Sequence, residues 1–293
     1  MQNQEKQNKP TFAYFGTSKF AVYVLEELKK DGLIPSLIIT TEDKPKGRKL
    51  VLTPPEVKVW AENEKIKYIQ PNSLKGEEIV EEIKSYSKND FDVFIVCSYG
   101  KIIPKKILEI PKFKTLNVHP SLLPKLRGPS PLQSAILSEN ETGVTIMRLD
   151  EEVDHGPILA QEEINIEWPP HFEDIEKIAG QIGGKMLSKI INPWISGEIV
   201  ETEQNHELAT FTKKIEKKDS ELDLRDSPET NLRKIRAYSN WPGTYFFEEI
   251  NKEKKRVIVK KAHLENNALI LDRVIPEGKK EMDYLDFLRG IKN

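Results

Sequence analysis

The chain has 293 residues, 38% of them hydrophobic and 31% charged, which is the balance of a globular protein long enough for two domains. Its net charge of −2 gives no overall indication of nucleic-acid binding. The single cysteine, Cys97, excludes an intrachain disulfide and any zinc site built from several thiolates.

Residues 1–10 are polar and lack the apolar core of a secretory signal, so we expect a disordered N-terminal segment. Nowhere does the sequence approach the roughly 20 consecutive apolar residues of a membrane-spanning helix. We therefore expect a protein of the cytoplasm that makes no contact with membranes.

Strand and helix patterns alternate over residues 11–195. Strands are expected at 11–15, 33–39, 68–69, 91–97, 115–118, 143–149 and 158–166, and helices at 19–30, 56–64, 77–87, 132–137 and 173–190. The unbroken apolar run at 91–97, which contains Cys97, is typical of a central parallel strand covered on both faces. The alternation predicts an α/β domain with a doubly wound, Rossmann-like parallel sheet.

The pattern changes after residue 195. Residues 196–207 are expected to form a linker to a second domain over residues 208–293. There, Ser227-Pro228 begins a helix with proline at its first position, and short β-like runs follow at 244–247, 256–260 and 268–271. Strands at this spacing around one helix predict a small β-barrel.

Three polar residues at the centre of the chain, Asn117, His119 and Asp154, form a candidate active site. Asn117 and His119 are two residues apart at the end of an expected strand, so their side chains point to the same face. An amide, an imidazole and a carboxylate can bind a developing oxyanion, move a proton and orient the imidazole. By spacing alone, the pair is as readily a loop anchor, and Asp154 as readily a turn residue.

Other functional patterns are weak or absent in the sequence. It lacks the glycine spacing of a dinucleotide site, a phosphate-binding P-loop and a Gly-x-Ser-x-Gly elbow. The five histidines show no metal-ligand spacing, so we expect no metal. Two basic clusters, at 44–49 and 252–261, are as readily solvated surface as a contact for a polyanion.

The sequence motifs around the three polar residues resemble those of a known protein family. The segments Asn117 to Pro124, Arg127-Gly128, Glu141 to Met147 and Asp154-x-Gly156 resemble the 10-formyltetrahydrofolate formyltransferase superfamily. Further motifs extend the resemblance over residues 11–290 and narrow it to the methionyl-tRNA formyltransferase family: Phe15-Gly16-Thr17, Asp43-Lys44-Pro45, Trp241-Pro242-Gly243 and Phe287 to Gly290.

The resemblance implies transfer of the formyl group of 10-formyltetrahydrofolate to the α-amino group of methionine on charged initiator tRNA, with Asn117, His119 and Asp154 as catalytic residues. Asn117 would donate an amide N–H to the oxygen that gains negative charge. His119 would donate a second hydrogen bond or move a proton. Asp154 would either stabilise His119 or draw the amine proton through a water, and the sequence leaves both roles open.

The resemblance also implies an OB-like C-terminal domain that binds tRNA, and it implies binding residues for both substrates. The residues implied to bind the folate co-substrate are Ser121, Leu122, Leu123, Pro124, Tyr99, Gly100, Ile102, Asp150 and Val153. The residues implied to bind tRNA are Lys44, Lys46, Arg48, Lys49, Lys254, Lys255 and Arg256. After Gly47-Arg48 some family members have a glycine and two basic residues, where this chain has Lys49-Leu50-Val51. Either Lys46 and Lys49 compensate or this loop makes fewer phosphate contacts.

Two alternatives remain open on sequence alone. One is a formyltransferase that acts on an amino sugar nucleotide, which needs the same three polar residues. The other is a non-catalytic protein that binds tRNA or folate. The basic loop and the C-terminal motif favour tRNA over a sugar, and the intact Asn117, His119 and Asp154 favour catalysis. The absence of a coiled-coil pattern leads us to expect a monomer.

Overall fold

The computed structural model describes residues 9–47, 50–250 and 252–291, and the chain divides into two compact units. The first unit comprises Met1–Arg127, Gly143–Ile164 and Glu176–Thr210, and the second comprises Gly128–Thr142, Asn165–Ile175 and Phe211–Asn293. Two short pieces from the first two thirds of the chain therefore belong to the second unit.

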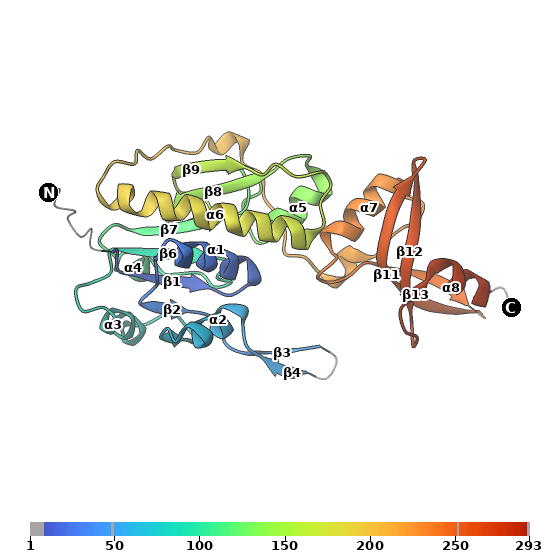
Figure 1. Ribbon diagram of the computed structural model, residues 1–293, viewed down its shortest axis with the longest axis horizontal. Helices are drawn as coiled ribbons and strands as arrows, with labels where there is room; N and C mark the ends of the chain where they lie inside the picture. Colours follow the sequence, from blue (N-terminus) through green and yellow to red (C-terminus); the bar gives the residue numbers. More distant parts are fainter. Residues whose placement is uncertain (1–8, 48–49, 251, 292–293) are drawn as a thin grey trace. The chain divides into compact units, whose positions relative to one another are not determined.

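The first unit is built on a mixed sheet, which contains seven strands over the described residues (Figure 1). In sheet order the strands are β5 (Tyr68–Ile69), β2 (Leu37–Ile39), β1 (Phe12–Gly16), β6 (Val93–Cys97), β7 (Thr115–His119), β8 (Gly143–Arg148) and β9 (Ile158–Glu163). The first five are parallel, which confirms the predicted α/β class with a large parallel sheet. One edge of the sheet departs from the parallel arrangement, because β8 runs antiparallel to β7 and β9 antiparallel to β8.

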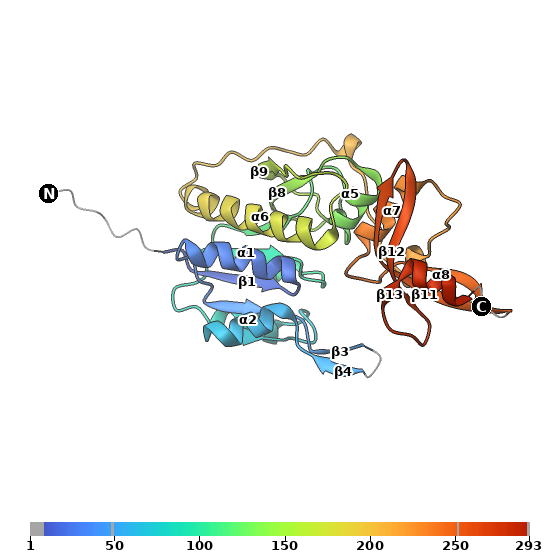
Figure 2. The same cartoon turned by 45° about the vertical axis from the view of Figure 1, so that its right-hand side comes forward.

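Helices cover both faces of this sheet (Figures 1 and 2). One face carries α1 (Lys19–Lys30) and the C-terminal part of α6 (Phe172–Ile195), and the other carries α3 (Glu77–Ser85) and α4 (Lys105–Leu108). Helix α2 (Glu56–Glu64) packs beside α1, and the hairpin β3 (Lys44–Lys46) and β4 (Val51–Thr53) precedes it in the chain. The close approach of α6 requires glycine, since a Cβ at Gly183 would lie 2.6 Å from the Val118 side chain.

Several predicted boundaries move in the structure. Strand β2 has three residues where seven were predicted, because Pro35 has no N–H to donate to a neighbouring strand. Helix α6 continues to Ile195, beyond its predicted end at residue 190, and β9 ends at Glu163 rather than at residue 166. Cys97 is fully buried at the end of β6, as its apolar surroundings predicted.

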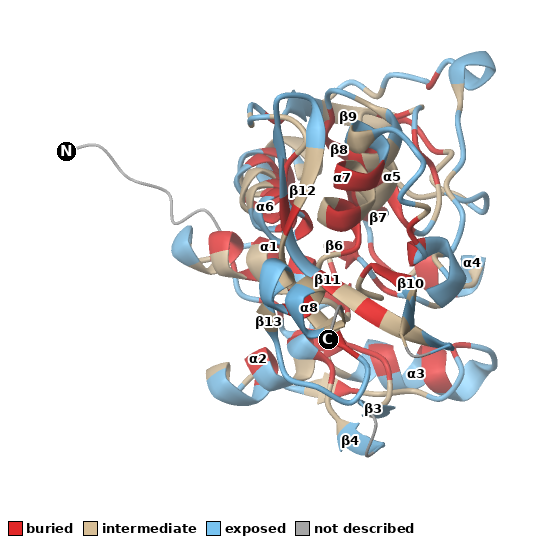
Figure 3. Cartoon of the chain, turned by 90° about the vertical axis from the view of Figure 1, so that its right-hand side faces the viewer, coloured by how far each residue is buried: buried red, intermediate tan, exposed pale blue. Residues whose placement is uncertain are grey.

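The second unit contains a four-stranded antiparallel sheet, counted within the described ranges, in the order β10 (Tyr245–Ile250), β11 (Glu253–Glu265), β12 (Ala268–Pro276) and β13 (Met282–Asp283). Strands β11 and β12 are longer than predicted, and β11 has an irregular register between Val259 and Ala262. Helices α5 (Pro131–Ser138), α7 (Pro228–Ala237) and α8 (Tyr284–Ile291) complete the unit. Buried residues of α7 and β11, drawn in red in Figure 3, contribute to its core.

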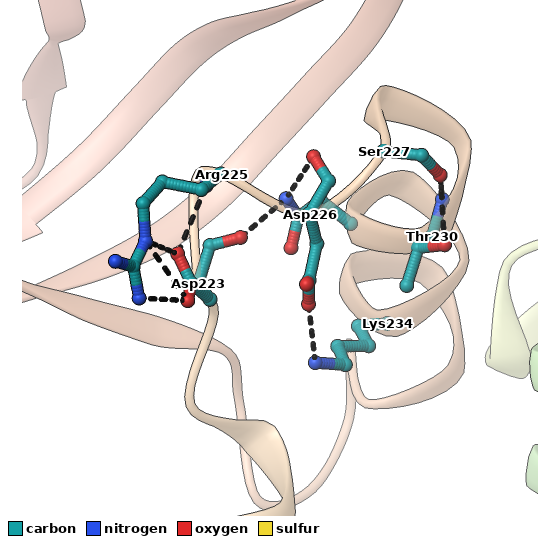
Figure 4. A network of polar contacts seen from close by, with 7 residues as sticks. Asp223, Arg225, Asp226, Ser227, Thr230 and Lys234 are labelled. Carbon is teal, nitrogen blue, oxygen red and sulfur yellow. Dashed lines mark hydrogen bonds and ion pairs between the residues drawn. The ribbon is translucent and has the colours of Figure 1, made fainter.

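The predicted start of α7 is confirmed in detail. The Ser227 hydroxyl accepts a hydrogen bond from the Thr230 backbone N–H at 3.1 Å (Figure 4). Pro228 is the first residue of the helix. The preceding turn is held by ion pairs from Asp223 to Arg225 at 2.6 Å and from Asp226 to Lys234 at 3.4 Å. Two short 3-10 helices, η1 (His206–Leu208) and η2 (Lys217–Ser220), lie in the segment before α7.

Candidate active site

Strand β7 places Asn117 and His119 on one face of the sheet. In the ladder Asn117 lies between Val96 of β6 and Met147 of β8, and the two polar residues are only 7% and 4% exposed. Within the residues that the structure describes, the Asn117 carboxamide has no hydrogen-bond partner, although buried polar groups are nearly always paired. The amide is therefore available to a bound substrate.

The His119 ring is held through Nε2, which lies 3.1 Å from the carbonyl oxygen of Leu126. A carbonyl oxygen can only accept a hydrogen bond, so Nε2 carries the proton. Nδ1 lies 3.6 Å from Oδ1 of Asp154, which is beyond the usual range of a direct hydrogen bond. The ring is thus oriented by Leu126, and Nδ1 and the carboxylate are left facing each other.

Asp154 reaches His119 from an unexpected direction. Arg148, the last residue of β8, lies opposite Leu116, so the loop that follows leaves from the end of β7 away from His119. It must fold back along the sheet to place Asp154 beside the imidazole. The fold-back is tight, because a Cβ at Gly156 would lie 2.0 Å from the carbonyl oxygen of Arg148.

Within this loop, Asp150 is engaged in holding the backbone. Its carboxylate accepts a hydrogen bond from the Glu152 N–H at 2.9 Å and pairs with Nδ1 of His155 at 2.8 Å. The ring of His155 in turn stacks on that of His206, with centroids 4.1 Å apart. Val153, by contrast, is 63% exposed.

The turn Ser121 to Pro124 follows His119 directly and is fixed by hydrogen bonds. The Ser121 hydroxyl donates to the Lys125 carbonyl at 2.7 Å, and the Ser121 carbonyl accepts from the Thr145 hydroxyl at 2.6 Å. Gln161 donates to the Leu123 carbonyl at 2.8 Å. These contacts use the polar groups of the turn for its own structure. Thr145 lies on β8 within the motif Glu141 to Met147 and Gln161 lies on β9, and neither is among the site residues predicted from the sequence.

The remaining predicted folate residues follow β6. Tyr99 is 6% exposed, its ring lies 5.5 Å from that of Phe15, and its hydroxyl has no partner among the described residues. Burial raises the pKa of the Tyr99 hydroxyl above its ordinary value, so it stays protonated and can donate a hydrogen bond. Gly100 is exposed, and Ile102 is 87% exposed.

The predicted basic residues lie in different units. Lys44 and Lys46 are on the exposed hairpin strand β3, with Lys46 paired to Glu56 at 3.1 Å, whereas Arg48 and Lys49 lie outside the described residues. In the second unit, Lys254 Nζ lies 4.3 Å from the Phe247 ring centroid and the Arg256 guanidinium lies 3.8 Å from that of Tyr245. Lys255 pairs with Glu253 at 3.1 Å.

Within residues 9–47, 50–250 and 252–291, no three His, Cys, Asp or Glu side chains gather as a metal ion would require. No helix in this part of the chain combines the length and apolar character needed to cross a membrane.

Two family models match the chain. The model described as "Formyl transferase" matches residues 9–191, and that described as "Formyl transferase, C-terminal domain" matches residues 214–269. The second match thus lies within the predicted C-terminal domain and ends at residue 269.

Individual proteins are also similar. A methionyl-tRNA formyltransferase of Halalkalibacterium halodurans is 36% identical, over 94% of this chain and 93% of the relative. One of Thermotoga neapolitana is 41% identical, over 80% of this chain and 74% of the relative. Among solved structures, an N-formyltransferase of Helicobacter canadensis in complex with folinic acid and dTDP-3-aminofucose shares the fold, with a TM-score of 0.62, 21% identity and 88% of each chain covered.

Proposed function

Because this chain belongs to the formyl transferase family, we propose that it transfers a formyl group from 10-formyltetrahydrofolate to the α-amino group of methionine on charged initiator tRNA. The product, formylmethionyl-tRNA, is used to start translation. The names of the Halalkalibacterium and Thermotoga relatives support this acceptor. The structural observation that supports the chemistry most directly is the unpartnered Asn117 carboxamide beside the His119–Asp154 pair.

In the proposed reaction the donor supplies an electrophilic formyl carbon for the amine to attack. Asn117 donates an amide N–H to the formyl oxygen as negative charge builds on it. His119 accepts the amine proton at Nδ1, because Nε2 is already protonated and held by Leu126. Asp154, 3.6 Å away, stabilises the imidazolium that results. As the tetrahedral intermediate collapses, the bond between the formyl carbon and the folate nitrogen breaks, and the imidazolium returns its proton to that nitrogen. In this proposal His119 is the base that takes the amine proton, and Asp154 stabilises the charge on His119 rather than drawing the proton itself.

For the folate donor, we propose contacts from the residues predicted to bind it. Ile102 and Val153 present exposed apolar side chains, and the protonated Tyr99 hydroxyl is without a partner in the described structure. Pockets for such ligands combine apolar walls with a few polar groups. A folate-type donor follows from the family, and its identity as 10-formyltetrahydrofolate is part of the proposal.

For tRNA, we propose contacts from the hairpin region 44–49 and from Lys254, Lys255 and Arg256. The Lys254–Phe247 and Arg256–Tyr245 pairs combine a cation with an aromatic ring, a combination that suits a phosphate backbone with accessible bases. We further propose that the protein works in the cytoplasm as a monomer.

The proposed function is tested by supplying the purified protein with 10-formyltetrahydrofolate and one of two acceptors, methionyl initiator tRNA or dTDP-3-aminofucose. We expect formylation of the charged tRNA and none of the sugar nucleotide. Formylation of the sugar nucleotide alone would establish the alternative acceptor. Binding of tRNA or folate without turnover on either acceptor would indicate a non-catalytic protein.

Replacing Lys254 with alanine tests the tRNA surface. Since Lys254 is exposed and its cation lies over Phe247, we expect the KM for tRNA to rise by about fivefold. The slope of the logarithm of the tRNA binding constant against the logarithm of salt concentration should become less negative by about one. The KM for the folate donor should not change. Lys185→Ala, which removes an exposed lysine of α6, is the matched control. Equal weakening by both variants would show a general charge effect rather than a contact at Lys254.

A further inference from the structure

The segment predicted as a linker contains a buried glutamine, Gln204, that hydrogen-bonds to the loop containing Asp154. Gln204 is 4% exposed, and its Nε2 donates to the carbonyl oxygens of Asp154 at 3.0 Å and Gly156 at 2.7 Å. Its Oε1 accepts from Nη2 and Nε of the buried Arg127 at 2.6 and 3.2 Å. All four hydrogen-bonding positions of this carboxamide are therefore used.

Thr210, which lies just beyond the predicted linker, supports the His119 side of the pair. The Thr210 hydroxyl accepts from the Leu126 N–H at 2.8 Å, and the Thr210 carbonyl accepts from the Arg127 N–H at 2.9 Å. Leu126 is the residue whose carbonyl orients His119. Residues 204–210 thus fix the backbone behind both His119 and Asp154.

Asp154 needs such support more than His119 does. His119 lies on a strand paired on both sides, whereas Asp154 lies in a loop that folds back along the sheet. Asp154 has a φ of +49°, a conformation that residues with a side chain adopt at some cost. Without the two hydrogen bonds from Gln204, the carbonyl groups of Asp154 and Gly156 would lose a buried donor.

We infer that Gln204, held in place by Arg127, is a positioning residue that sets Asp154 against Nδ1 of His119. It touches neither substrate in the proposed reaction and acts through the backbone of the Asp154 loop. The inference rests on the proposed function for its kinetic consequence, while its structural consequence is independent of the reaction.

The variant Gln204→Glu separates the two halves of this contact. A carboxylate keeps an acceptor for Arg127, so the buried guanidinium remains paired, but it has no N–H to donate to Asp154 and Gly156. We expect kcat for formylation to fall by about tenfold to a hundredfold, because small displacements of a catalytic group have effects of this size. The KM values for donor and tRNA should change by less than about twofold.

Hydrogen–deuterium exchange of the same variant, measured by peptide mass spectrometry, gives a readout that does not depend on the reaction. Exchange in residues 150–157 should become about tenfold faster, while peptides from β1 and β6 keep the exchange of the unsubstituted protein. Glu203→Gln, a change at the exposed neighbouring residue, is the matched control and should alter neither measurement.

Each outcome decides one question. A Gln204→Glu variant that retains turnover, or that slows without faster exchange in residues 150–157, overturns the inference. Faster exchange across the whole first unit also overturns it, because Gln204 would then serve general stability. If the unsubstituted protein fails to formylate methionyl-tRNA, the proposed function fails, and the exchange contrast still decides the role of Gln204.

Discussion

Replacing Asn117 with alanine is expected to lower the rate of formyl transfer by about a hundredfold to a thousandfold, which is the usual loss when one oxyanion donor is removed. The loss should appear in kcat, because the hydrogen bond strengthens as the formyl oxygen gains charge. The fold should tolerate the change, since no described residue depends on the Asn117 carboxamide for a hydrogen bond.

Single-turnover formylation at saturating donor and tRNA measures this effect, and filter binding measures tRNA affinity, which should change by less than about twofold. Asn89→Ala is the matched control, because Asn89 is an exposed asparagine outside the site. A collapse of tRNA binding with turnover per bound complex preserved would mean that Asn117 has a structural role and is not the oxyanion donor.

Replacing Asp154 with asparagine should lower turnover by about a hundredfold or more, since the imidazolium formed at His119 loses its neighbouring negative charge. Asparagine matches aspartate in size and adopts left-handed backbone conformations readily, so the φ of +49° should persist. The hydrogen bond from Gln204 should persist as well, because it is made to the backbone carbonyl.

The control for this variant can be matched closely. Asp90 is exposed and has a φ of +61°, so Asp90→Asn makes the same chemical change in the same backbone conformation, far along the chain from the site. We expect unchanged turnover for Asp90→Asn and unchanged tRNA binding for both variants. Normal turnover in Asp154→Asn would show that His119 works without a neighbouring charge.

The sequence predicted the parts of this molecule that local pattern determines. Apolar runs located β1 and β6, and the Ser227-Pro228 signal located the start of α7. The direction of β8 and β9 was not predicted, because an apolar run of five or six residues has the same pattern in either orientation.

The sequence predicted the three side chains of the candidate site but not the groups that hold them in place. Asn117, His119 and Asp154 lie within recognisable sequence motifs. In the structure, Nδ1 of His119 lies 3.6 Å from Oδ1 of Asp154. Gln204 had no such signal, because a glutamine among polar residues looks like solvated linker until its burial is known. Likewise, the group that orients His119 is a backbone carbonyl, at Leu126, which any residue type would supply.

The position of Gln204 and Thr210 in the chain has a consequence for its evolution. Thr210 is the last residue of the first unit and Phe211 the first of the long C-terminal piece of the second. A connector that only joins two bodies tolerates insertions and deletions, since nothing depends on its register. Here, adding or removing one residue between Gln204 and Thr210 would displace one of the two hydrogen-bonded ends. On the proposed role of Gln204, the length of the segment 204–210 is therefore set by its hydrogen bonds to the Asp154 loop and to Leu126.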